Sequence, residues 1–117
     1  MRLPFVDQAY VPRDKMVQYL LSTSHPQGRY KVLFFRALGF SASEPEAFAF
    51  ALCEHARNEP VIRSVDSKYG TVYVVEGILK GPVANAMARS VWIVERGSSR
   101  PRLVTTFPAP LRWRTGS

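Results

Sequence analysis

The sequence contains one cysteine and two histidines, and this scarcity excludes several kinds of site. Cys53 has no second cysteine with which to form an internal disulfide. No group of cysteine and histidine residues has the spacing of metal ligands, so the sequence indicates neither a metal ion nor a cofactor. This composition fits a reducing compartment, and we expect the protein to act in the cytoplasm.

Long apolar runs are missing as well. The apolar stretch after Met1 is too short for a signal peptide, and no run approaches the roughly 18 residues of a membrane-spanning helix. We therefore expect no membrane partner, although a domain cut from a larger secreted protein would show the same features. Paired carboxylates for glycoside hydrolysis, a glycine-rich phosphate loop and a serine-hydrolase elbow are also absent.

Acidic residues are few, with 9 Asp and Glu against 16 Lys and Arg, which leaves a net charge of +7. The excess grows late in the chain, because Glu95 is the last acid. The basic residues that follow it are Arg96, Arg100, Arg102, Arg112 and Arg114. An anionic partner is therefore expected: a nucleic acid, an acidic protein or a membrane surface. Charge sets the sign of the partner and does not choose among these three.

The chain has 117 residues, of which 46% are apolar, so we expect one folded domain over residues 1–117. Apolar spacing predicts an extended lead-in over 1–12 and helices over 13–21, 28–38 and 43–57. Gly39 is expected to form a left-handed cap, and Ser43 and Glu46 have capping-box spacing. Alternation predicts strands over 61–65, 71–79, 86–95 and 102–107, followed by a polar tail over 108–117. The predicted fold is α+β, with about three N-terminal helices packed on one face of a four-stranded antiparallel sheet.

The segment from His25 to Lys31 places an imidazole and two cations, Arg29 and Lys31, at the start of the second predicted helix. Cations at a helix N-terminus cost roughly a few tenths of a kcal/mol unless an anion neutralises them. A bound phosphate would do so. The competing interpretation is structural: the lysine stem lies along apolar surface, Arg29 is solvated, and His25 belongs to a turn.

Alternation along 86–95 places Arg89 on one strand face with apolar neighbours, and Ser90 and Trp92 on the other. If the face of Arg89 is buried, the arginine has to be paired or line a cleft. The alternatives are that this face is solvated or that Arg89 pairs with Glu76 or Glu95.

Strand hydroxyls form a second set of candidates. Ser90, Thr105 and Thr106 are each more typical of structure than of chemistry, since strands favour threonine. Pairing of the last two strands can bring them near Arg89, with the register left open. We interpret His55 as a packing histidine and Trp92 as core.

These segments resemble an uncharacterised bacterial domain family. The motifs that carry the resemblance are His25-Pro26-x-Gly28-x-x-Lys31, Phe35, Leu38-Gly39-Phe40, Tyr69-Gly70-Thr71-x-Tyr73, Gly81-Pro82, Arg89-Ser90-Val91-Trp92-Ile93-Val94 and Pro101-Arg102-Leu103-Val104-Thr105. Ser90 departs from the usual threonine, and Tyr30 is bulkier than expected. Members of the family occur alone or at the C-terminal ends of polymorphic toxins, beside a gene for a small neutralising partner. The family looks similar to the metal-independent ribonucleases that include barnase, EndoU, the tRNA-cutting colicins and RelE.

The resemblance implies a toxin-type endoribonuclease that leaves a 2′,3′-cyclic phosphate. We predict His25, Lys31, Arg89 and Thr105 as catalytic residues, with Arg29, Ser90, Arg102 and Thr106 binding substrate. The implied partners are RNA, including tRNA, and an acidic antitoxin or immunity protein; the oligomeric state stays open. The alternative from another class is a binding module that holds nucleic acid or an acidic protein without chemistry. An antidote role is disfavoured, because nuclease antidotes are commonly acidic.

Overall fold

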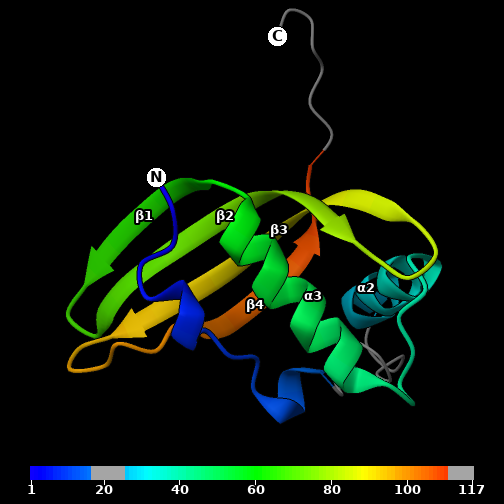
Figure 1. The fold of residues 1–117 in the computed structure, drawn as a ribbon, viewed down its shortest axis with the longest axis horizontal. Coiled ribbons are helices and arrows are strands. Elements are labelled where there is room, and N and C mark those ends of the chain that lie inside the picture. The colour runs from blue at the N-terminus through cyan, green and yellow to red at the C-terminus, as the bar shows by residue number, and fades with distance from the viewer. Residues whose placement is uncertain (17–25, 111–117) are drawn as a thin grey trace, which may run out of the picture.

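The computed structural model describes residues 1–16 and 26–110, and helices precede strands in this part of the chain. Figure 1 shows α3 lying across a twisted sheet, with α2 near one end of it. The elements in chain order are η1 (Val6–Gln8), α2 (Pro26–Ala37), α3 (Pro45–Asn58), β1 (Val61–Ser67), β2 (Gly70–Lys80), β3 (Asn85–Glu95) and β4 (Arg102–Pro108). Residues 13–16 are also helical, whereas 17–21 of the first predicted helix lie outside the described residues. The α+β class and the four-stranded antiparallel sheet are confirmed.

The helix starts differ from the predicted ones where proline acts on the backbone. Helix α3 begins at Pro45, because proline suits the first helical position, where no N–H is needed. The predicted capping box of Ser43 and Glu46 is wrong. Glu44 stands at the N-cap without a side-chain hydrogen bond, and the Ser43 hydroxyl lies 2.8 Å from that of Ser41.

Gly39 ends α2 with φ = 103°, as its predicted left-handed cap requires. Its N–H donates to Arg36 O at 2.9 Å, and the N–H of Phe40 donates to Phe35 O at 3.3 Å. A Cβ at Gly39 would lie 2.8 Å from the backbone nitrogen of Val83. A larger residue would therefore be strained and would collide with the β2–β3 connection.

The strands pair in sequence order as an antiparallel meander, β1-β2-β3-β4. Between β2 and β3 the register is regular from Gly70↔Glu95 to Lys80↔Asn85. Between β3 and β4 it shifts by one residue, because Trp92 pairs with Leu103 and Val91 pairs with Thr105. Val104 is the extra residue, and this bulge sets which hydroxyls of β4 face each side.

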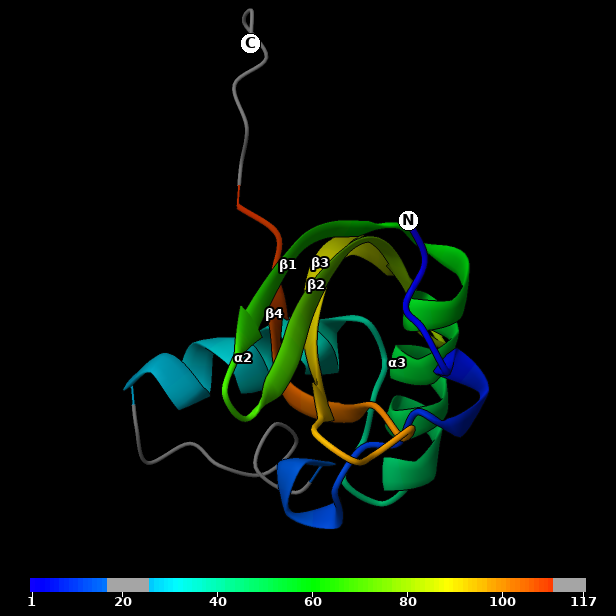
Figure 2. The ribbon, with the colours of Figure 1, turned by 90° about the vertical axis from the view of Figure 1, so that its left-hand side faces the viewer.

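The two faces of the sheet are buried to different extents. In β3, Ala88, Ser90 and Trp92 are fully buried, while Arg89 and Val91 between them are only half-buried. Figure 2 shows α3 on one side of the sheet and the N-terminal half of α2 extending to the other side. The expectation that the helices share one face is therefore met by α3 but not by α2. We call the side away from α3 the open face.

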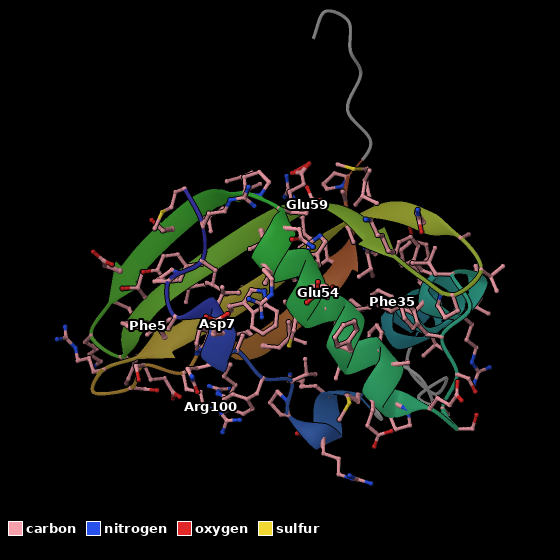
Figure 3. The ribbon with its side chains drawn as sticks, viewed as in Figure 1. Phe5, Asp7, Phe35, Glu54, Glu59 and Arg100 are labelled. Atoms are coloured by element: carbon pink, nitrogen blue, oxygen red, sulfur yellow. The ribbon has the colours of Figure 1, made fainter. Side chains whose placement is uncertain are left out.

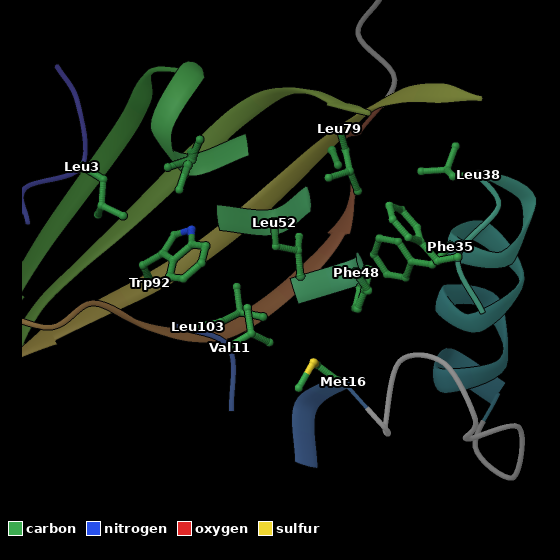
Figure 4. Close-up of a cluster of buried hydrophobic side chains, with 14 residues drawn as sticks. Leu3, Val11, Met16, Phe35, Leu38, Phe48, Leu52, Leu79, Trp92 and Leu103 are labelled. Atoms are coloured by element: carbon green, nitrogen blue, oxygen red, sulfur yellow. The ribbon is translucent and has the colours of Figure 1, made fainter. Parts of the chain in front are cut away.

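The core lies between α3 and the sheet (Figure 4). The rings of Phe35 on α2 and Phe48 on α3 are 4.9 Å apart at one end, and Trp92 is buried at the centre of β3, as predicted. Leu3 and Val11 of the lead-in belong to the same core. Tyr10 also forms a parallel bridge with Arg102, so the lead-in shields the start of edge strand β4, although Val6–Gln8 form η1 in place of the predicted extended backbone.

Among the described residues, no helix is long and apolar enough to cross a membrane.

Candidate functional site

The open face receives side chains from three separate segments. Val91 and Thr105 are partners in the β3–β4 register, as are Arg89 and Phe107, and paired residues point to the same side of a sheet. Glu76 pairs with Arg89 from β2. Lys31 reaches this side from the N-terminal half of α2. We call Lys31, Glu76, Arg89, Thr105 and Phe107 the open-face cluster.

Lys31 lies over the β4 edge of the cluster. Its ammonium group donates to Thr105 Oγ1 at 3.3 Å and lies 5.9 Å from the centre of the Phe107 ring. The lysine and the threonine are 74 positions apart in the sequence. The fold therefore places the predicted catalytic pair Lys31 and Thr105 in direct contact.

Arg89 is the register partner of Phe107, one strand further into the sheet. Its Nε and Nη2 both lie 3.0 Å from Glu76 Oε1, and the two side chains are 24% and 11% exposed. Pairing with Glu76 was one of the alternatives for this arginine. Because a guanidinium has five N–H donors, the pair leaves other donors of Arg89 for a ligand on the open face.

Ser90 and Thr106 point the opposite way, into the core below α3. Both are buried, and Thr106 Oγ1 donates to Arg89 O at 2.8 Å. Thr105 and Thr106 face opposite sides because neighbouring residues of a strand alternate, and the bulge at Val104 puts Thr105 on the side opposite to Leu103. The predicted substrate-binding residues Ser90 and Thr106 are therefore not part of the open-face cluster.

Three further predicted site residues, His25, Arg29 and Arg102, are not counted in the open-face cluster. His25 lies outside the described residues, and the backbone of Arg29 belongs to α2 while its side chain is not described. Arg102 is on the open face opposite Ile93, near the start of β4, and pairs with Glu95 at 3.6 Å. It lies outside the cluster, toward the loops that join the strands.

The sequence did not predict two members of the open-face cluster as site residues, Glu76 and Phe107. Glu76 is the one acid within the apolar run 71–79, and this position could have marked it as a site residue. From the sequence, Glu76 was considered only as a partner for Arg89. Phe107 gave no signal, since an aromatic residue ending a strand is ordinary. Its place beside Lys31, and opposite Arg89 in the β3–β4 register, depends on strand pairing.

His55 and Ser90 form a buried polar network with Trp92 behind the sheet. Trp92 Nε1 donates to Ser90 Oγ at 2.8 Å, which leaves the Ser90 hydroxyl to donate to His55 Nδ1 at 2.9 Å. The Nε2–H of His55 then faces the carbonyl oxygens of Gly77 and Ala88 at 3.2 and 3.1 Å. The neutral imidazole satisfies every partner, which supports the interpretation of His55 as a packing residue.

Burial lowers the pKa of His55 below its ordinary value of 6.5, outweighing the two carbonyl hydrogen bonds and Glu59, which act to raise it. The unfolded chain binds this proton at a higher pH than the folded chain. Stability should therefore fall as the pH drops below about 6.5, by at most about 1.4 kcal/mol per pH unit for this group. Urea unfolding between pH 5 and pH 7.5 measures the slope. His55→Gln should flatten it, and an unchanged slope in that variant would contradict the assignment.

Charge is distributed unevenly over the molecule. Four of the nine acidic residues lie in or beside α3: Glu44, Glu46, Glu54 and Glu59. Figure 3 shows Glu54 and Glu59 on this helix, on the side away from the open face. An anionic ligand is therefore disfavoured beside α3 and favoured at the opposite side.

A hollow of about 450 Å³ lies on the α3 side, between that helix and the β2–β3 connection. Phe40, Phe50 and Pro82 supply apolar walls, Glu54 and Glu59 supply acids, and His55 is part of its lining. None of the predicted catalytic or substrate-binding residues whose side chains the structure describes lines it.

The comparisons with known proteins bear on the family and the fold. Residues 2–110 match the family described as "Domain of unknown function (DUF6883)". The chain belongs to the DUF6883 family. This membership agrees with the resemblance to an uncharacterised domain family seen in the sequence. None of the curated proteins compared with the chain matches it.

A solved structure shares the fold of this DUF6883 domain. It is a chain of a contact-dependent growth inhibition toxin and immunity protein complex from Klebsiella pneumoniae 342. The TM-score is 0.69 over 92% of this chain and 98% of that chain, with 17% sequence identity. At this identity the likeness shows a common fold.

Proposed function

We propose that this DUF6883 domain is a toxin-type endoribonuclease that cleaves RNA without a metal ion, at the open-face cluster. The observation that carries the proposal is the contact of Lys31 with Thr105 on the same sheet face as Arg89, with the three residues supplied by α2, β4 and β3. Two cations and a hydroxyl on a half-buried sheet face suit a phosphate diester, since charged donors bind and stabilise phosphoryl oxygens.

RNA carries its own nucleophile, so the proposed chemistry needs positioning and proton transfer. A base removes the proton of the ribose 2′-hydroxyl, whose oxygen attacks the adjacent phosphorus. The bond from phosphorus to the 5′-oxygen breaks, and that oxygen takes up a proton. Lys31 and Arg89 neutralise the non-bridging oxygens in the transition state, while Thr105 orients the phosphate. The products are a 2′,3′-cyclic phosphate and a 5′-hydroxyl.

Two groups are candidates for the base. His25 is the candidate from the sequence, because imidazole titrates near neutrality. Glu76 is the candidate from the structure, because its carboxylate lies in the cluster beside Arg89. The acidic limb of the pH–rate profile separates them, since imidazole and carboxylic acids titrate in different ranges. Loss of that limb in His25→Ala or in Glu76→Gln identifies the base.

The toxin role draws support from the fold shared with a chain of a toxin and immunity protein complex. Such a complex contains both kinds of protein, and the net charge of +7 favours the toxin side for this chain. We propose a small acidic immunity protein or antitoxin as the partner, covering the cationic open face. The site of action is then the cytoplasm, where RNA is found.

Incubation of the purified protein with tRNA or total RNA in excess EDTA tests the activity. We expect cleavage that is unaffected by the chelator, with 2′,3′-cyclic phosphate and 5′-hydroxyl ends on the fragments. Substitution of 2′-deoxynucleotides at the cut site should abolish cleavage, because it removes the nucleophile. RNA that is bound with salt-dependent affinity and stays intact would instead indicate a binding module.

A further inference from the structure

The two loops at one end of the sheet are joined by a single arginine. The backbone N–H of Arg96, after β3, donates to Tyr69 O at 2.9 Å, and its Nε donates to Lys68 O at 2.6 Å. Tyr69 and Lys68 form the turn between β1 and β2. The β3–β4 loop is anchored in turn, because the Arg100 guanidinium lies 4.0 Å from the centre of the Tyr10 ring. We call Lys68, Tyr69 and Arg96 the tip patch.

Tyr69 is the exposed aromatic residue of the tip patch. The residue is 67% exposed, so burial in the core does not explain an aromatic residue here. The Lys68 ammonium lies 5.2 Å from the centre of the ring. Single-stranded nucleic acids bind to exposed aromatic rings that lie beside cations, because a base stacks on the ring and a phosphate contacts the cation.

The open face connects the tip patch to the open-face cluster. Arg63 pairs with Val74, which pairs with Val91, which pairs with Thr105, so Arg63 lies on this face. The acids at this end of the sheet are engaged, since Asp66 accepts a hydrogen bond from the Thr71 hydroxyl and Glu95 pairs with Arg102.

We infer that the tip patch is a second RNA subsite, where a base stacks on Tyr69 and a phosphate contacts Lys68. Arg89 and Arg96 are seven positions apart on and just beyond β3, roughly 23 Å along an extended strand. A ligand that occupies both places is single-stranded and on the order of four nucleotides or longer. The inference rests on the proposed ribonuclease function, in which the open-face cluster is the first subsite. It adds that the substrate is single-stranded RNA.

Binding of an uncleavable RNA tests the subsite independently of catalysis. Fluorescence anisotropy compares a 2′-O-methyl three-nucleotide RNA with a twelve-nucleotide RNA, for wild type and variants. Tyr69→Ala should weaken binding of the longer RNA by about fivefold or more and leave the shorter one unchanged, while Tyr69→Phe should stay close to wild type. Lys68→Gln should reduce the slope of log affinity against log salt by about 0.7. Arg57→Gln is the matched control, because it removes one charge from the α3 side.

Two results would overturn the inference: wild-type binding of the longer RNA by Tyr69→Ala, or equal weakening of both lengths. Its failure is distinct from failure of the proposed function. If RNA is cleaved and Tyr69 has no effect on binding, the ribonuclease stands without a second subsite. If no RNA is cleaved and the length-dependent effect of Tyr69 is present, the tip patch binds single-stranded RNA and the catalytic proposal falls.

Discussion

Lys31→Ala is expected to lower kcat/KM for RNA cleavage by about 10²-fold or more, because it removes a positive charge where negative charge develops on the phosphate. The Lys31 ammonium donates to the Thr105 hydroxyl and lies near the Phe107 ring. Initial rates on a fluorogenic RNA substrate at saturating and limiting concentrations separate the effect on kcat from that on KM.

Arg89→Gln should cause a loss of similar size, and Arg57→Ala serves as the control. Arg57 is an exposed arginine on α3 that pairs with Asp7 and Glu54, so removing it changes the net charge without touching the open face. Because Arg89→Gln removes a half-buried ion pair with Glu76, thermal unfolding must show that the variant is folded at the assay temperature. Near-wild-type cleavage by Lys31→Ala, or an equal loss in Arg57→Ala, would contradict the proposed site.

Ser90→Ala is expected to destabilise the protein by about 2–6 kcal/mol without changing the activity of the folded fraction. The Ser90 hydroxyl joins Trp92 Nε1–H to His55 Nδ1 in the core, and alanine leaves both without this partner. Each buried polar group that loses its hydrogen bond costs about 1–3 kcal/mol. Urea unfolding followed by tryptophan fluorescence gives the free energy of unfolding.

Ser64→Ala is the matched control for this substitution. Ser64 is exposed on edge strand β1, so the same chemical change should alter stability by no more than about 0.5 kcal/mol. If Ser90→Ala kept wild-type stability and lost cleavage, Ser90 would belong to the substrate site after all, as the sequence had suggested.

Local patterns in the sequence predicted most of the elements. Apolar spacing located α2 and α3, alternation located the four strands, and Gly39 marked the end of α2 because only glycine adopts its backbone angles easily. The errors lie at helix starts: α3 was predicted to begin at Ser43 and begins at Pro45. Such ends depend on a few weak local contacts, and neighbouring positions differ little in free energy.

The candidate site was predictable only in part, for a reason visible in β3 and β4. Alternation alone placed Arg89 and Ser90 on opposite faces of a strand. It did not decide which face α3 covers, nor whether Thr105 or Thr106 joins Arg89. The bulge at Val104 made that choice, and a shift of one residue in register exchanges the two threonines.

The residues by themselves determined the excess of positive charge, the order of helices and strands, and the two-residue period that separates Arg89 from Ser90. These properties depend on composition and on contacts between near neighbours. Only the tertiary structure decided that Lys31 reaches Thr105 across 74 positions, that Glu76 joins Arg89, and that α3 gathers acids on the other side. Long-range strand pairing and the packing of α2 past β4 made these choices, and no local period in a sequence encodes them.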